Sequence, residues 1–195
     1  TTIPFLSAGL TVRGVRRRPD GSYPLEDLEA ALRPSTKAVA VSLVQFNSGF
    51  RVDVQGLAAL CRSRNLVLAL NGAQAIGHVR IDMKQLGASF LSMTSHKWLG
   101  AGYGTGMLAI ASDWLETLPM AGWLSVPQEE LWRAFPASQR SDDAHGFVAT
   151  KAAVRKEASA LEGGGGMWLN CQALDAALDV HERVGDVLPR IHALQ

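Results

Sequence analysis

The sequence predicts an α/β fold in which a mostly parallel sheet is flanked by helices. Two apolar runs, Leu66–Leu70 and Phe90–Met93, have the length and composition of buried strands. Between them, Ile81–Gly87 has room for a short helix with Asp82 near its start. A strand, a helix and a second strand in this order imply a parallel pair joined by a right-handed crossover.

The segment before this unit repeats the alternation of helix and strand. Pro24 suits the start of a helix over Leu25–Leu32, where apolar residues recur at helical spacing. Ala38–Val44 is a run of small and branched apolar residues, which predicts another buried strand. Asp53 is a suitable N-cap for a helix over 54–64.

The segment after the unit is predicted to be less regular. Met107–Ile110 is expected to be a strand, and Asp113–Leu118 a short helix. Residues 119–148 hold many turn formers and are interpreted as an excursion, either a lid or a subunit contact. Leu169–Val184 has the spacing of an amphipathic helix, and Val187–Leu194 starts another.

Composition narrows the class of protein. The chain has 195 residues, 47% hydrophobic and 19% charged, which is enough material for a sizeable core. The net charge of +1 does not favour nucleic acid or membrane partners, and the cluster Arg13–Arg18 is interpreted as a solvated strand edge. No stretch reaches membrane-spanning length, and no signal peptide is evident. Cys61 and Cys171 are expected to be buried free thiols, which indicates a reducing compartment, the cytoplasm.

Two polar clusters follow the two central strands. Asn71–Gln74 ends the first strand and Thr94–Lys97 ends the second. Parallel strands bring both clusters to the carboxyl edge of the sheet, where open α/β folds bind ligands. Lys97 follows a buried strand, so we expect partial desolvation, which favours the neutral amine that Schiff-base chemistry needs. The alternative is a lysine that extends to solvent from a strand end.

The motif around Lys97 resembles the class V aminotransferase family of fold-type I enzymes, which use pyridoxal 5′-phosphate (PLP). The family includes cysteine desulfurases, selenocysteine lyases and isopenicillin N epimerase-like proteins. The resemblance rests on SHKWLGAGYGTG at 95–106 and NGAQ at 71–74. Looser matches are Val44–Asp53, Gly122–Ser125 and Glu162–Gly164.

The resemblance implies a role for each matched residue. Lys97 would hold PLP as a Schiff base and later move the substrate proton. Gln74 would bond to the phenolic oxygen of PLP, and Ala73 would pack on one face of its ring. Thr94 and His96 would contact the phosphate.

Two positions depart from the family pattern. The family has an aspartate at the position of Asn71, where its carboxylate keeps the pyridine nitrogen protonated and makes the ring a strong electron sink. Losing such a charge-assisted bond costs roughly 1.5–3 kcal/mol in a buried site. The family threonine that reaches the partner subunit's phosphate is replaced by Gly165. A site with Asn71 in place of the aspartate could still bind PLP. The alternative is that Asn71 marks a protein that has lost its activity.

The resemblance also predicts the domain organisation. Residues 1–165 would form a partial large domain, and residues 166–195 a helical connection toward a small domain. The chain is then expected to lack the family's N-terminal segment and its C-terminal small domain, and to cover roughly half of a subunit. Fold-type I sites are built between subunits, so a homodimer is expected.

Three functions compete at this point. The first is a PLP enzyme acting on an amino acid by lyase, transaminase or epimerase chemistry. The second is a diverged, non-catalytic relative that serves as a binding or structural module. The third, a nucleotide-binding domain, rests only on the glycines of Gly100–Gly106. A metal site at Asp142, Asp143 and His145 is disfavoured, because these residues share one short loop without a second ligand cluster.

Overall fold

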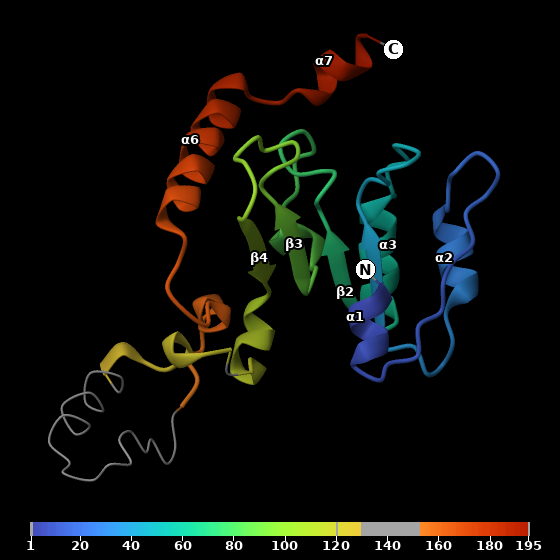
Figure 1. Ribbon diagram of the computed structural model, residues 1–195. Helices are drawn as coiled ribbons and strands as arrows, with labels where there is room; N and C mark the ends of the chain where they lie inside the picture. Colours follow the sequence, from blue (N-terminus) through green and yellow to red (C-terminus); the bar gives the residue numbers. More distant parts are fainter. Residues whose placement is uncertain (1, 120, 130–152, 195) are drawn as a thin grey trace, which may run out of the picture. The chain divides into compact units, whose positions relative to one another are not determined.

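The computed structural model describes residues 2–119, 121–129 and 153–194 (Figure 1). Its centre is a four-stranded sheet with the strand order β1-β2-β3-β4. The first three strands are parallel and β4 is antiparallel to β3, which confirms the mostly parallel sheet. The strands are β1 (Ala38–Ser42), β2 (Val67–Asn71), β3 (Phe90–Thr94) and β4 (Gly106–Ile110).

Short helices with well-defined ends connect the parallel strands. Asp53 caps α3 (Val54–Ser63) by accepting a 3.0 Å hydrogen bond from the backbone three residues on. Asp82 caps α4 (Met83–Leu86) in the same way at 2.8 Å. Gly87 ends α4 in the left-handed conformation (φ 69°), which glycine adopts without steric cost. The helices predicted between the parallel strands and the N-cap at Asp53 are therefore confirmed, with α4 shorter than the predicted 81–87.

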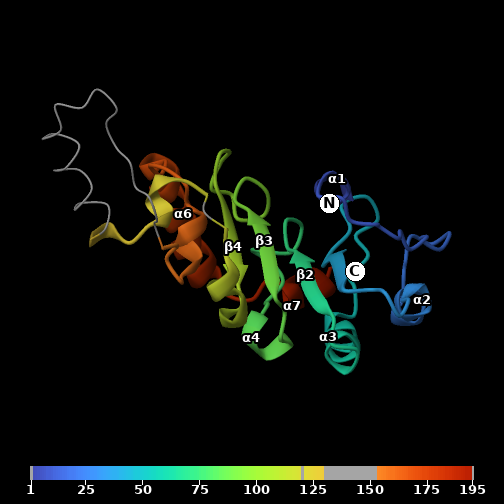
Figure 2. The ribbon, with the colours of Figure 1, turned by 90° about the horizontal axis from the view of Figure 1, so that it is seen from below.

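The core lies between the sheet and the helices on one of its faces. α2 (Leu25–Ala31), α3 and α4 lie on that face (Figure 2). Leu57 of α3 and Leu68 of β2 are at most 1% exposed, and Cys61 packs in the same cluster. Burying one such side chain contributes about 1.5–3 kcal/mol to folding. This apolar layer holds the strands in register.

The described chain forms two compact units. The first spans Thr1–Ala111 and Leu169–Gln195, and it holds the sheet together with nearly all of α6 (Trp168–Val184) and α7 (Leu188–His192). The second spans Ser112–Trp168. Its 3-10 helices are η1 (Ser112–Thr117), η2 (Trp123–Ser125) and η3 (Ala158–Leu161). The expected boundary at residue 165 stays a prediction.

The second unit is organised around a buried serine. Ser125 is fully buried, and its hydroxyl accepts hydrogen bonds from the backbone of Ala121 and Gly122. The same hydroxyl donates to the carbonyl of Ala160 at 2.6 Å. One side chain therefore joins the two described segments of this unit, on either side of residues 130–152.

One sequence prediction is wrong at the amino-terminal end, because the cluster Arg13–Arg18 lies in no strand. The helix α1 (Thr2–Ser7) was not predicted. Arg18 instead donates to Asp27 at 2.8 Å and to Glu26 at 3.0 Å, in the first turn of α2. The two carboxylates in the first turn of that helix therefore hold the Arg18 guanidinium without any sheet edge.

Smaller differences affect three other predictions. β1 stops at Ser42 because Val44 forms a bridge with Arg51 across a tight loop. The helix expected at 113–118 is the 3-10 helix η1. Cys171 is exposed on α6, whereas Cys61 is buried as expected. The possible metal cluster at 142–145 lies outside the described residues.

Candidate functional site

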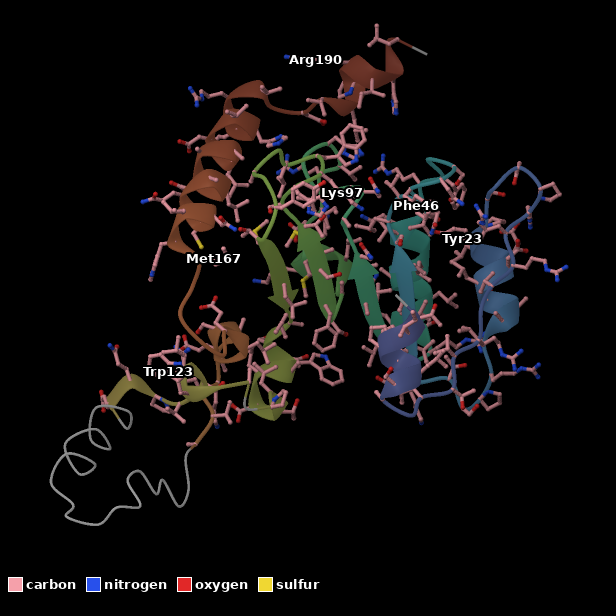
Figure 3. The ribbon with its side chains drawn as sticks, in the orientation of Figure 1. Tyr23, Phe46, Lys97, Trp123, Met167 and Arg190 are labelled. Carbon is pink, nitrogen blue, oxygen red and sulfur yellow. The ribbon has the colours of Figure 1, made fainter. Side chains whose placement is uncertain are left out.

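The two polar clusters meet at the carboxyl edge of the sheet. β2 ends at Asn71 and β3 at Thr94, and the two strands are parallel neighbours. The backbone N–H of Gly72 donates to the carbonyl of Ser92 at 2.8 Å, which ties the loop after β2 to β3. Figure 3 shows Lys97 beyond this edge. The residues that the sequence singled out thus come from two adjacent loops.

Asn71 is fixed by its own loop. Its side-chain Oδ1 accepts a 2.9 Å hydrogen bond from the backbone N–H of Ala73. Its main-chain carbonyl accepts a 2.9 Å bond from the N–H of Leu43, at the end of β1. The side chain is half-buried. Both the backbone and the amide of Asn71 therefore have defined orientations.

Gln74 is held by a residue of the second loop. The indole N–H of Trp98 donates to Oε1 of Gln74 at 3.0 Å. An indole is a donor only, so this bond fixes which end of the amide faces Trp98. The NH₂ group of Gln74 is then the end that remains to donate elsewhere. Trp98 was not among the predicted site residues.

His78 packs against the same indole. Its ring lies 4.7 Å from that of Trp98, tilted by 55°. Burial, and then the positive charge of Arg51, hold the pKa of His78 below its usual value. A neutral imidazole is therefore favoured beside Trp98. His78 lies in the turns that follow β2.

Thr94 carries a hydroxyl without a partner. Its Oγ1 is buried and makes no hydrogen bond to the described part of the chain. An unpaired buried hydroxyl is unfavourable by about 1–3 kcal/mol. A ligand or a bound water at the strand end can supply the missing bond.

Ser95 closes the loop that carries Lys97. It is fully buried, and its hydroxyl lies 2.7 Å from the carbonyl of Thr105 and 3.0 Å from that of Gly102. Its backbone carbonyl accepts from the N–H of Ala101 at 3.0 Å. Ser95 was not among the predicted site residues. Its place between Thr94 and His96 was the signal in the sequence that could have identified it, but its burial depends on the fold of the loop.

Lys97 is exposed, so the expected desolvation is wrong for this structure. The loop turns sharply after Lys97, where its carbonyl accepts from Gly100 at 3.1 Å. Gly100 and Gly102 have no side chains that could cover the amine. His96 is half-buried and stacks on Tyr103, with ring centroids 4.5 Å apart and planes at 15°.

Helix α6 supports the loop after β3 from within the same compact unit. Nε2 of His181 lies 3.2 Å from the carbonyl of Leu99, and Asn170 donates to the carbonyl of Tyr103 at 3.0 Å. Gly77 has φ +102°, and a Cβ there would lie 2.8 Å from the Trp98 carbonyl oxygen. Only glycine permits this approach of the two loops.

The glycines after Lys97 form a turn and not a nucleotide-binding loop. Gly100, Gly102 and Gly104 all have positive φ, and the chain then enters β4 at Gly106. A dinucleotide fingerprint would open a helix at this point. The basis for the nucleotide-binding hypothesis is therefore absent.

The assembled edge offers an amine, an imidazole, a hydroxyl and two amides. These groups suit a phosphate-bearing carbonyl compound, because the amine can form a Schiff base and the other groups can donate to oxygen.

Across residues 2–119, 121–129 and 153–194, no group of three or more His, Cys, Asp or Glu side chains is placed to hold a metal ion. No helix in those segments is both long and apolar enough to cross a membrane.

Comparison with known proteins points to one family. A family model for class V aminotransferases matches residues 6–133. The cysteine desulfurase IscS of Aeromonas hydrophila is 33% identical over 92 residues, which are 47% of this chain and 23% of that protein. A mitochondrial cysteine desulfurase of Arthroderma benhamiae is 33% identical over 81 residues, which are 42% and 16%. The chain thus spans less than a quarter of the length of these curated relatives.

Solved structures agree on the fold. The apo cysteine desulfurase of Thermococcus onnurineus has a TM-score of 0.73 at 22% identity, covering 94% of this chain and 42% of that chain. A variant of C-DES with glycine covalently linked to its PLP cofactor has a TM-score of 0.66 at 24% identity, covering 86% and 41%. These likenesses confirm the fold-type I architecture, and the family supports the prediction of PLP as the cofactor.

The described residues fit this cofactor. The buried hydroxyl of Thr94 lacks a partner that a phosphate oxygen would supply. Gln74 keeps an amide NH₂ for a phenolic oxygen, because its carbonyl is already bonded to Trp98. The amine of Lys97 is accessible for a bond to an aldehyde. No described contact blocks these three groups.

Proposed function

Because the chain belongs to the class V aminotransferase family, we propose that it forms the central part of a PLP-dependent enzyme that acts on an amino acid through Lys97. The observation that carries the proposal is the unpartnered, buried hydroxyl of Thr94, three residues before an exposed lysine. The hydroxyl can bond to a phosphate oxygen, and the accessible amine can bond to an aldehyde.

Each residue at the edge has a distinct task in this proposal. Lys97 forms the Schiff base and moves the proton of the amino-acid substrate. Thr94 and His96 bind the phosphate, and Gln74 donates to the phenolic oxygen. Ala73 packs against the ring. When bound, PLP supplies an electron sink for the charge left on the substrate when a bond to its α-carbon breaks.

The first test is a titration of the 195-residue chain with PLP, followed by visible absorbance. Borohydride reduction and peptide mapping then locate the adduct. We expect one adduct on Lys97 that Lys97→Ala removes. Lys84→Ala is the matched control, because Lys84 is an exposed lysine on α4 and lies outside the two loops. A chain that binds no PLP, or binds it equally in Lys97→Ala, refutes the proposal.

Lyase, transaminase and epimerase chemistry on an amino acid can all begin with the same step, in which Lys97 takes the proton from the α-carbon. Exchange of the α-hydrogen of amino acids in deuterium oxide, followed by proton NMR, reports this step without naming the substrate in advance. Product analysis on the amino acids that exchange then separates the three reaction types. Lys97→Ala should abolish the exchange.

A non-catalytic relative is the second candidate, and two positions favour it. Asn71 replaces the family's aspartate, and Gly165 replaces its threonine in an open stretch where a Cβ would meet nothing within 4 Å. If this candidate is right, the Lys97 adduct forms but no amino acid exchanges its α-hydrogen.

A homodimer and a cytoplasmic location are part of the same proposal. They are supported by the family, whose sites combine two subunits, and by the two free cysteines. Light scattering after size-exclusion chromatography tests the dimer. A monomer that binds PLP on Lys97 would contradict the homodimer and leave the rest of the proposal intact.

A further inference from the structure

We propose that Asn71 donates its side-chain NH₂ to the ring nitrogen of PLP, so that this site holds the cofactor with its pyridine nitrogen unprotonated. The inference rests on the proposed function and deepens it, because the protonation state of the ring decides which reactions the site favours.

The orientation of the Asn71 amide is the first step of the argument. Oδ1 accepts the backbone N–H of Ala73 at 2.9 Å. An amide NH₂ cannot accept this N–H, so a flipped amide would place two donors against each other. The strand end is also held, because the main-chain carbonyl of Asn71 bonds to Leu43. The carbonyl oxygen of the amide is therefore committed to the loop, and its NH₂ is the end available to a ligand.

Gln74 shows the same arrangement three residues on. Its Oε1 is bonded to the indole N–H of Trp98, a group that can only donate. Both amides of this loop therefore use their oxygens within the protein and keep their NH₂ groups for a ligand. The loop offers donors to the two ring acceptors of PLP, the pyridine nitrogen and the phenolic oxygen.

A donor at the ring nitrogen selects one protonation state. A protonated pyridine nitrogen is itself a donor and would face the Asn71 NH₂ without a hydrogen bond. An unprotonated nitrogen has a lone pair that accepts from it. A carboxylate at this position would select the opposite state, since it only accepts and carries a negative charge.

The neighbouring loops supply no substitute carboxylate. The loops at 43–52, 72–79 and 95–105, which follow β1, β2 and β3, contain no Asp or Glu. Their ionisable side chains are Arg51, His78, His96, Lys97 and Tyr103. Once Lys97 is bonded to the cofactor, Arg51 is the permanent positive charge among these side chains, and it opposes a further positive charge on the ring.

The consequence is a weaker electron sink. Transamination places a proton on the aldehyde carbon of the cofactor, so it needs substrate charge to be spread through the ring. Returning the proton from Lys97 to the α-carbon of the amino acid makes a smaller demand. We therefore expect the site to favour α-proton exchange over transamination, with the proton leaving and returning through Lys97.

The test uses PLP labelled with ¹⁵N in its ring, bound to the 195-residue chain and observed by ¹⁵N NMR. We expect the chemical shift of an unprotonated pyridine, and Asn71→Asp should move it to that of a pyridinium. The same variant should speed α-hydrogen exchange by about tenfold or more, since it restores a charge-assisted bond. The matched control is Asn65→Asp, an exposed residue at the opposite end of β2; it should change neither quantity.

The outcomes separate this inference from the proposed function. A pyridinium signal in the wild-type chain, with the adduct still on Lys97, overturns the inference alone. If Asn71→Asp folds and binds PLP but its ¹⁵N chemical shift equals that of the wild-type chain, the inference is likewise overturned alone. Absence of any adduct on Lys97 refutes the proposed function and the inference together. Circular dichroism checks that both Asp variants are folded.

Discussion

Replacing Ser95 by alanine should loosen the loop that carries Lys97 without unfolding the sheet. The hydroxyl lies 2.7 Å from the carbonyl of Thr105 and 3.0 Å from that of Gly102, but it has one proton to donate. The variant therefore loses about one neutral hydrogen bond, which contributes about 0.5–1.5 kcal/mol.

The surroundings place the cost near the middle of this range. The Thr105 carbonyl keeps a second donor, the backbone N–H of Ser95 at 3.2 Å. Gly102 is exposed, so water can reach its carbonyl. Neither acceptor is left buried and unpaired, and we expect a loss of about 1 kcal/mol, or roughly fivefold in the folding equilibrium. Ser95→Val should cost more, about 1–3 kcal/mol, because this site is fully buried and cannot accept extra volume.

Urea unfolding gives the global free energy, and amide hydrogen exchange locates the change. Ala101 donates its N–H to the Ser95 carbonyl, so its exchange should become faster in Ser95→Ala. The amide of Leu70, inside β2, should change only by the global loss. Ser63→Ala, at an exposed position of α3, is the control and should stay within about 0.5 kcal/mol of wild type. If Ser95→Ala alters neither stability nor the exchange of Ala101, the serine does not hold the loop.

Three further predictions concern the neighbouring side chains. Thr94→Val removes an unpaired buried hydroxyl, so the free energy of unfolding should stay the same or rise by up to about 1 kcal/mol, as measured by urea unfolding. The same variant should lower PLP affinity about tenfold in an absorbance titration. Trp98→Phe keeps an aromatic ring but removes the indole N–H that holds the Gln74 amide, so PLP affinity in the same titration should fall about fivefold. The lowered pKa of His78 means that the unfolded chain protonates first as the pH falls. Its contribution to stability should be complete above about pH 6.5 and decline between that value and the lowered pKa; Arg51→Gln should raise this pKa in a histidine NMR titration, and an unchanged pKa would contradict the contribution of Arg51 while leaving that of burial.

Local sequence signals were sufficient for the elements around the site. Asp53 and Asp82 precede apolar helical segments, and their carboxylates cap the first turns as an N-cap residue does. Strand ends were less accurate, since β1 stops two residues before the predicted end. The bridge from Val44 to Arg51 that ends it depends on loop closure, which apolar patterning does not report.

The amino-terminal segment shows where patterning fails. Arg13–Arg18 has no hydrophobic periodicity, so the sequence offered only a charge cluster. The position of Arg18 is decided by Glu26 and Asp27, eight and nine residues later in α2. Contacts of this kind depend on how the chain turns at residues 19–22.

The sequence by itself determined the order of strands and helices, and it placed Asn71–Gln74 and Thr94–Lys97 after neighbouring strands. Those features follow from local periodicity, caps and the rule for parallel crossovers. Only the tertiary structure decided that Lys97 is exposed, that Ser95 is buried and that Trp98 fixes the amide of Gln74. Burial and the orientation of an amide depend on atoms that arrive from other loops, and no local pattern encodes those atoms.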